Sequence, residues 1–232
     1  MRLDKLLANK AFGSRKEVHQ IIKDRRVTVN DIIVVKKDYP INIDTDTIAV
    51  DGSQISTKQL YYIKFHKPAG YITAVEDRSH PVVMDLLPPE FKKMGVFPVG
   101  RLDKDTEGLL LLTNDGVWAH SIINGHKHVP KVYYVEFHGI LSKEGLERIS
   151  VGIVLGDGIQ CKPATINILS DKSLEITIEE GKYHQVKRMI GAAGGEVTYL
   201  KRLSVGHITL SGIEETNTYL EIDDQEIADF KK

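Results

Sequence analysis

Two short apolar runs enclose a dense polar segment in the middle of the chain. Residues 96–99 and 109–112 are apolar, whereas residues 100–108 between them read Gly-Arg-Leu-Asp-Lys-Asp-Thr-Glu-Gly. Apolar runs of this length beside turn residues are typical of buried strands. Loops that rigid strands hold in place are also where functional side chains concentrate. The segment therefore predicts two core strands joined by a polar loop, and that loop is the first candidate for chemistry.

The residues of this loop leave three interpretations open. The first is a solvated hairpin loop without a function. The second is a calcium loop starting at Asp103, but its twelfth position is Asn114, where a calcium loop requires a bidentate glutamate. The third is a pair of catalytic acids, Asp103 and Asp105, whose separation the sequence does not determine.

Positive charge gathers in residues 1–37, which hold ten lysines and arginines against four acidic residues. The whole chain has a net charge of -1, so any surface that binds nucleic acid has to be local. A local excess of this kind is typical of a phosphate-binding surface. A solvated basic helix face explains the charge equally well.

Beneath these charges, the pattern predicts two helices followed by a hairpin. Leu3, Leu6 and Leu7 have the spacing of one helical face. Ser14 and Glu17 form a capping box, in which each side chain satisfies a free backbone N–H at the start of a second helix. Alternating apolar residues on either side of an Asn-Asp turn then predict the hairpin.

A domain boundary is expected in the polar, turn-rich stretch at residues 44–60. We therefore predict one domain over residues 1–57 and a second over residues 60–232. The single cysteine, Cys161, excludes a disulfide framework and a cysteine metal cluster. The first residues lack the apolar core of a signal peptide, and no apolar run approaches the ~20 residues of a membrane span. We expect a cytoplasmic protein without a membrane partner.

The basic N-terminal segment resembles the small S4-like RNA-binding domain with its alpha-L motif, first described in a ribosomal protein. The resemblance rests on RLDKLLAN, then GSRKEV, then a helix ending in RRVTVN, and covers roughly residues 1–50. Such domains contact the RNA backbone, which positions the RNA without reading its sequence. The resemblance implies an RNA-binding surface lined by Arg2, Arg15, Lys16, Lys23, Arg25 and Arg26.

The polar loop belongs to a longer string, GRLDKDTEGLLLLTNDG, which resembles the nucleophile motif of pseudouridine synthases of the RsuA/RluA type. Upstream, KPAGY resembles the first motif of that family. The family's catalytic aspartate falls on Asp103. Its neighbours Arg101 and Leu102 are implied to line the substrate pocket, with Arg101 holding the flipped nucleotide or filling its place. The alternative for Arg101, also within the family, is a plain surface residue that forms an ion pair.

Three later strings resemble the remaining motifs of the family, in the family's order. In KVYYV the active-site tyrosine falls on Tyr133, which by itself could be a core aromatic residue. In EGKYHQVKRM the basic partner of the aspartate falls on Lys187, with Arg188 as the neighbouring alternative. In LKRLSVG the apolar residue that lines the uracil pocket falls on Leu203.

The resemblance implies an α+β chain, in which an α/β N-terminal module precedes a synthase domain built on a mostly antiparallel mixed sheet. The leading RNA-binding domain and the form of EGKYHQVKRM favour the RsuA branch. Within that branch, the enzymes of small-subunit (16S) rRNA are the most similar. The same chemistry on large-subunit (23S) rRNA, or a non-catalytic ribosome-assembly factor, are the alternatives.

Pseudouridylation cuts a C–N glycosidic bond, rotates the uracil and rejoins it through carbon. One carboxylate can act as nucleophile or stabilise the sugar cation, so the resemblance implies no metal and no organic cofactor. A basic side chain such as Lys187 would orient the aspartate. The expected partner is rRNA of the small subunit, in free or assembling subunits, and the expected state is a monomer.

Overall fold

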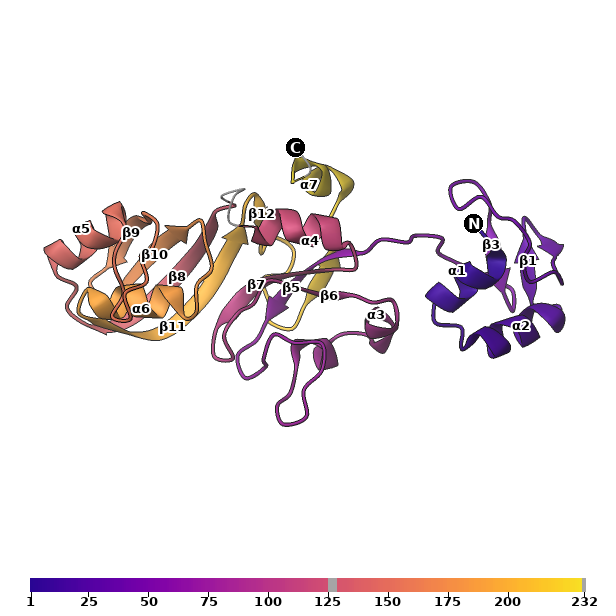
Figure 1. Ribbon diagram of the computed structural model, residues 1–232, viewed down its shortest axis with the longest axis horizontal. Helices are drawn as coiled ribbons and strands as arrows, with labels where there is room; N and C mark the ends of the chain where they lie inside the picture. The colour runs from indigo at the N-terminus through magenta and orange to yellow at the C-terminus, as the bar shows by residue number, and fades with distance from the viewer. Residues whose placement is uncertain (125–128, 231–232) are drawn as a thin grey trace. The chain divides into compact units, whose positions relative to one another are not determined.

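The computed structural model describes residues 1–124 and 129–230 of the chain. These residues form two compact units (Figure 1). The N-terminal unit comprises Met1–Tyr61 and Leu87–Val96, and the C-terminal unit comprises Tyr62–Leu86 and Phe97–Lys232. No helix of the described residues is both long enough and apolar enough to cross a bilayer.

The N-terminal unit packs helices against a small sheet. Its strands pair antiparallel in the order β2-β1-β3-β4. The leucines of the first helix and the apolar face of the second are buried against this sheet. The elements of the unit are α1 (Leu3–Asn9), α2 (Arg15–Lys23), β1 (Val27–Val29), β2 (Ile32–Ile33), β3 (Ile48–Val50), β4 (Ser53–Ile55) and α3 (Pro89–Lys93).

Local sequence signals explain how this unit begins. The Ser14 hydroxyl accepts from the backbone N–H of Glu17 at 3.4 Å, and the Glu17 carboxylate accepts from the N–H of Ser14 at 2.6 Å. This capping box starts α2 and confirms the predicted helix. Asn30 and Asp31 both have positive φ, which short polar side chains tolerate, and they turn β1 into β2.

The C-terminal unit is built on one large mixed sheet. The strands follow the order β13-β5-β7-β11-β8-β10-β9, with β6 and β12 attached to β7 and β11. Its elements are β5 (Tyr62–Lys67), η1 (Val83–Leu86), β6 (Phe97–Val99), β7 (Glu107–Thr113), α4 (Gly116–Ile123), β8 (Lys131–Gly139), α5 (Lys143–Val151), β9 (Thr165–Ser170), β10 (Ser173–Ile178), α6 (Gln185–Ala192), β11 (Gly195–Val205), β12 (Ile208–Thr209), β13 (Tyr219–Glu221) and α7 (Asp224–Asp229).

Only the pairing of β7 with β11 is parallel among the described strands; the others pair antiparallel. This confirms the mostly antiparallel mixed sheet that the family resemblance implied. The apolar run at residues 109–112 forms the middle of β7 and is fully buried, as predicted. Trp118 of α4 and Phe230, whose rings meet edge to face, cover one side of the sheet.

The parallel pair requires a glycine where it begins. Gly108 of β7 lies opposite Arg202 of β11 and has a φ of +106°, in a region that favours glycine. A Cβ at Gly108 would overlap the backbone carbonyl of Arg202. This close approach brings the two strands together directly beside the polar loop.

Candidate active site

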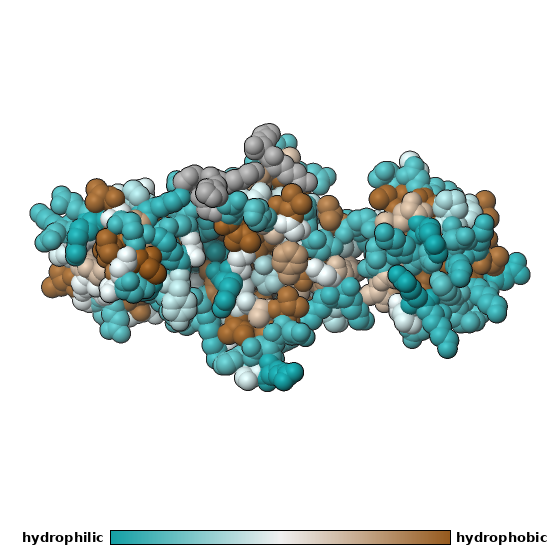
Figure 2. Space-filling view, in the orientation of Figure 1, coloured by the Kyte–Doolittle hydropathy of each residue, from teal (hydrophilic) through white to brown (hydrophobic). Residues whose placement is uncertain are grey.

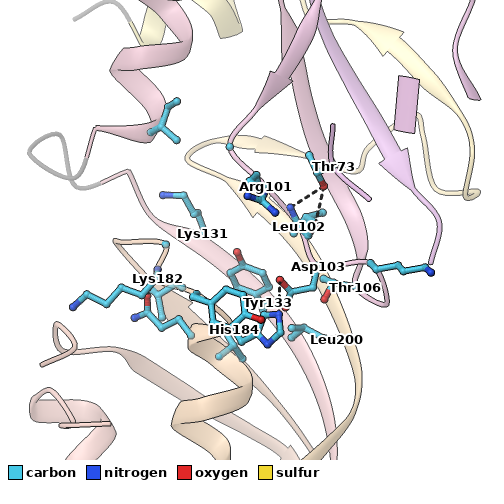
Figure 3. Close-up of a pocket in the computed structure, with 18 of the residues that line it drawn as sticks. Thr73, Arg101, Leu102, Asp103, Thr106, Lys131, Tyr133, Lys182, His184 and Leu200 are labelled. Atoms are coloured by element: carbon cyan, nitrogen blue, oxygen red, sulfur yellow. Dashed lines mark hydrogen bonds and ion pairs between the residues drawn. The ribbon is translucent and has the colours of Figure 1, made fainter. Parts of the chain in front are cut away.

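A cavity of about 590 Å³ opens in the C-terminal unit, where the polar loop faces β8, β11 and the segment before α6 (Figure 3). The loop between β6 and β7 forms one wall, and residues 181–186 form another. The cavity is lined by side chains that include Arg101, Leu102, Asp103, Tyr133, His184 and Leu200. Of the predicted pocket and catalytic residues, the cavity thus gathers Arg101, Leu102, Asp103 and Tyr133.

Asp103 faces the cavity between two basic side chains. Its side chain is 28% exposed. The Nε2 atom of His184 lies 3.6 Å from one carboxylate oxygen, and the Nζ atom of Lys187 lies 3.7 Å from the other. His184 and Lys187 are three residues apart at the start of α6, so they reach the loop from the same side. The carboxylate is therefore accessible to a substrate and fixed in direction.

Lys187 has a second and closer partner. Its Nζ donates to both carboxylate oxygens of Asp105, at 2.6 and 2.7 Å. These hydrogen bonds from Lys187 lower the pKa of Asp105 below its usual value. The predicted contact between Lys187 and Asp103 is thus longer than the contact between Lys187 and Asp105. Lys187 therefore bridges the two aspartates of the loop.

A buried lysine holds the loop from behind. Lys67, the last residue of β5, has no exposed surface, and its Nζ donates to the backbone carbonyls of Pro68, Lys104 and Thr106 at 3.0, 3.3 and 2.7 Å. Burial lowers the pKa of Lys67 to about 8. Within the KPAGY string, Lys67 therefore fixes the backbone of the residues that follow Asp103.

The hydroxyl of Thr73 holds the other side of the loop. It donates to the carbonyl of Leu102 at 2.8 Å and accepts from the N–H of the same residue at 3.1 Å. The backbone on both sides of Asp103 is therefore held by hydrogen bonds before any substrate arrives. Such preorganisation is what a catalytic carboxylate requires.

Tyr133 and Lys131 lie on the same face of β8, because they are two residues apart on a strand. Both line the cavity (Figure 3). Burial, together with the nearby Arg202, lowers the pKa of Lys131 to about 8. The Lys131 ammonium donates to the carbonyl of Val129 at 2.9 Å. The site therefore contains a lysine that titrates close to neutral pH and that sequence reasoning did not single out.

Two predicted pocket residues lie outside the cavity lining. Leu203 does not line it, and the leucine of β11 that does is Leu200. The register between β11 and β8 shifts between Arg202 and Ser204. The alternation of side chains along β11 therefore does not by itself predict which face of the sheet Leu203 lies on. Arg188 does not line the cavity either. It forms an ion pair with Asp157 and donates to a backbone carbonyl next to the cavity.

Comparison with known proteins decides the family. Residues 61–192 match the family model described as RNA pseudouridylate synthase, and residues 1–48 match that of the S4 domain. The chain belongs to the RNA pseudouridine synthase family. It is an isomerase of the RsuA type, with a leading S4 domain, as the resemblance of its motifs implied.

Several relatives match this pseudouridine synthase over nearly their full lengths. A Bacillus subtilis protein named as an uncharacterized RNA pseudouridine synthase is 42% identical, over 98% of this chain and 97% of the relative. The ribosomal small subunit pseudouridine synthase A of Escherichia coli K12 is 34% identical, over 98% and 99%. A crystal structure of a pseudouridylate synthase superposes with a TM-score of 0.69 at 31% identity, over 99% of both chains.

The six basic residues predicted for the S4 domain of this synthase fall into two groups. Arg2 and Arg26 form ion pairs with Asp4 and Asp51, each at 2.6 Å. The other four are exposed and make no ion pair with a described residue: Arg15, Lys16, Lys23 and Arg25. The charges of Arg2 and Arg26 are thus balanced by an aspartate, whereas no described acidic side chain pairs with the other four.

Within the described parts of the synthase, no group of three or more histidine, cysteine or acidic side chains is arranged to hold a metal ion. The functional residues that sequence reasoning missed are His184, Lys131 and Thr73. His184 belongs to the EGKYHQVKRM string, so the family motif did indicate that this histidine lies near the site. Lys131 belongs to the KVYYV string, in which only Tyr133 was singled out, and Thr73 carries no local pattern that separates it from ordinary loop residues.

Proposed function

We propose that this synthase isomerises a uridine of small-subunit rRNA to pseudouridine, with Asp103 as the nucleophile. The observation that carries the proposal is the position of Asp103 in the cavity, between His184 and Lys187 and on a loop held on both sides. The similarity to enzymes named for the small ribosomal subunit supports the choice of RNA.

In this proposal the carboxylate of Asp103 attacks C1′ of the uridine as the bond from C1′ to N1 breaks. The uracil leaves with the bonding electrons and rotates in the cavity, and C5 then bonds to C1′ as the ester oxygen departs. C5 loses its proton and N1 gains one, so no atom is lost overall. Tyr133, which lies on the cavity wall, is positioned to stack on the rotating base.

The uridine has to leave its RNA stack to reach the cavity. Extrusion of a base costs a few kcal/mol, which contacts in the pocket offset. Arg101 is exposed at the cavity edge, where it can bind the backbone of the extruded nucleotide or take its place in the stack. The four exposed basic residues of the S4 domain would hold the RNA backbone elsewhere.

Pseudouridine mapping tests this function. The purified protein is incubated with unmodified small-subunit rRNA, large-subunit rRNA and partially assembled small subunits, and pseudouridines are located by chemical derivatisation and primer extension. We expect one new stop on small-subunit RNA. A stop only on large-subunit rRNA keeps the chemistry and overturns the choice of RNA. Tight binding with no stop on any RNA favours a ribosome-assembly factor.

Replacing Lys187 by methionine tests the bridge between the two aspartates. Without its cation, Asp103 and Asp105 repel each other and the nucleophile loses its direction, so we expect kcat to fall about 10²-fold. Asp105→Asn should cost less, because Lys187 can then turn fully to Asp103. Single-turnover rates measure both. Lys143→Met, at an exposed helix position, is the control, and a Lys187→Met rate within about threefold of it would contradict the bridge.

The titration of Lys131 should appear in the pH profile. Its pKa of about 8 means that the ammonium form loses its proton as pH rises through that value. We expect the cation to stabilise negative charge on the RNA, so kcat/KM should fall above about pH 8. Lys131→Arg stays charged and should reduce this fall. Lys67 titrates in the same range in both proteins, so the difference between them isolates Lys131.

A further inference from the structure

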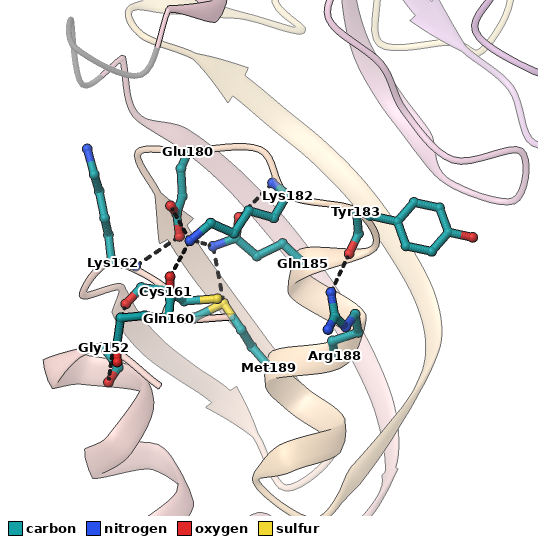
Figure 4. Close-up of polar contacts among 10 residues, drawn as sticks. All are labelled: Gly152, Gln160, Cys161, Lys162, Glu180, Lys182, Tyr183, Gln185, Arg188 and Met189. Carbon is teal, nitrogen blue, oxygen red and sulfur yellow. Dashed lines mark hydrogen bonds and ion pairs between the residues drawn. The ribbon is translucent and has the colours of Figure 1, made fainter. Parts of the chain in front are cut away.

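An exposed aromatic ring stands at the edge of the cavity without an assigned role. Tyr183 immediately precedes His184, and their rings stack at a centroid distance of 3.9 Å with 17° between the planes. Tyr183 is 76% exposed. In Figure 4 its ring points away from the polar contacts beside it, whereas its backbone carbonyl faces them. One face of the ring is covered by His184, and most of the remaining surface is open.

The backbone beneath this ring is held firmly. His184 has a φ of 47°, a left-handed conformation that costs energy for a residue other than glycine and that persists only where its surroundings impose it. Arg188 donates to the carbonyl of Tyr183 at 3.3 Å and is itself paired with Asp157. The ring of Tyr183 is therefore presented by an ordered segment and not by a loose loop.

A second group of hydrogen bonds fixes the preceding residues (Figure 4). The carboxylate of Glu180 accepts from Gln185 at 2.7 Å and from the N–H of Lys162 at 2.9 Å, and lies 3.0 Å from the Nζ of Lys182. Gln185 in turn accepts from the N–H of Lys182 at 2.9 Å. The segment that carries Tyr183 is thus tied at both ends, before and after the aromatic pair.

The stacked rings of His184 and Tyr183 extend from Asp103 to the exposed edge of the cavity. His184 is 3.6 Å from the carboxylate of Asp103, and Tyr183 stacks on His184. Both line the cavity. A nucleotide bound at Asp103 therefore has the rings of this pair beside it.

Extrusion of a uridine leaves its neighbours without a stacking partner. Proteins that bind unpaired RNA commonly stack such bases on exposed aromatic rings, which is favourable for every base because each has a π-face. We propose that Tyr183 is the stacking platform for a nucleobase adjacent to the uridine at Asp103. The inference rests on the proposed function, because it assumes that the cavity takes a uridine from an RNA strand.

Steady-state kinetics on small-subunit rRNA transcripts test the platform. Loss of one base–aromatic stack corresponds to roughly a tenfold weaker interaction, so Tyr183→Ala should raise KM about tenfold and leave kcat within about twofold. Tyr183→Phe keeps the ring and should behave as the wild type. Tyr219→Ala removes a tyrosine from β13, away from the cavity lining, and is the matched control.

A fluorescent base separates stacking from a purely structural role of the tyrosine. Short RNAs around the mapped uridine carry 2-aminopurine at the position before or after it, and Asp103→Asn protein binds them without turnover. We expect quenching at one of the two positions, lost in Asp103→Asn/Tyr183→Ala and kept in Asp103→Asn/Tyr183→Phe. Equal fluorescence in the alanine and phenylalanine proteins, or an unchanged KM, overturns the platform. Absence of pseudouridine with the wild-type enzyme would instead overturn the proposed function.

Discussion

Asp103→Asn should abolish pseudouridine formation while leaving the protein folded and bound to RNA. The amide has nearly the shape of the carboxylate but is no nucleophile and carries no charge, so we expect the rate to fall by at least about 10⁴-fold. The loop should keep its conformation, because Lys67 and Thr73 hold it through backbone atoms of neighbouring residues. Single-turnover assays on small-subunit rRNA measure the rate.

The matched control for this variant is Asp171→Asn, at an exposed aspartate between β9 and β10. Its rate should equal that of the wild type. RNA affinity, measured by gel shift, should stay within about threefold in both variants, because backbone contacts supply most of it. A rate for Asp103→Asn within tenfold of the control would remove Asp103 from the role of nucleophile.

Gly108→Ala should damage the sheet more than its single added methyl group suggests. The new Cβ would overlap the backbone of Arg202, and the φ of +106° is unfavourable for alanine. A backbone cannot move aside as a side chain does, so we expect a loss of at least about 3 kcal/mol in the free energy of unfolding. The melting temperature should fall by roughly 6–12 °C.

Gly116→Ala provides the comparison for the glycine prediction. Gly116 begins α4, has no positive φ, and has open space where its Cβ would lie. Alanine there should leave the melting temperature unchanged or raise it slightly, since it reduces the freedom of the unfolded chain. Thermal denaturation followed by circular dichroism compares the two variants, and equal melting temperatures would show that β7 and β11 can separate at Gly108 without cost.

Local signals in the sequence predict much of this fold. The capping box of Ser14 and Glu17 marks the start of α2 because both partners lie within one helical turn. The leucines at residues 109–112 form a continuous apolar run because all four are fully buried, so β7 has no solvated face over these residues. The parallel pairing of β7 with β11 leaves no such signal, since the two strands are far apart in the chain.

The family motifs contain the main residues of the site, but only the folded structure shows which of them face the cavity. Asp103 and Tyr133 line the cavity as the motifs implied. Lys131 belongs to the KVYYV motif, but its burial beside Tyr133 on one face of β8 depends on the folded sheet and has no signal in the sequence. Leu200 lines the cavity and Leu203 does not, and the register of β11 against β8 shifts between Arg202 and Ser204, an irregularity that depends on the partner strand.

Two of the hydrogen bonds that hold the loop of Asp103 do not depend on the side chain of residue 104. Lys67 and the N–H of Gly70 both bind the carbonyl oxygen of Lys104, at 3.3 and 2.7 Å, while the Lys104 side chain is exposed. Every amino acid carries that oxygen, so a replacement of Lys104 keeps both of these hydrogen bonds. With Cys161 buried, Lys104→Cys would give a single addressable thiol, and a dye attached there would report the arrival of RNA.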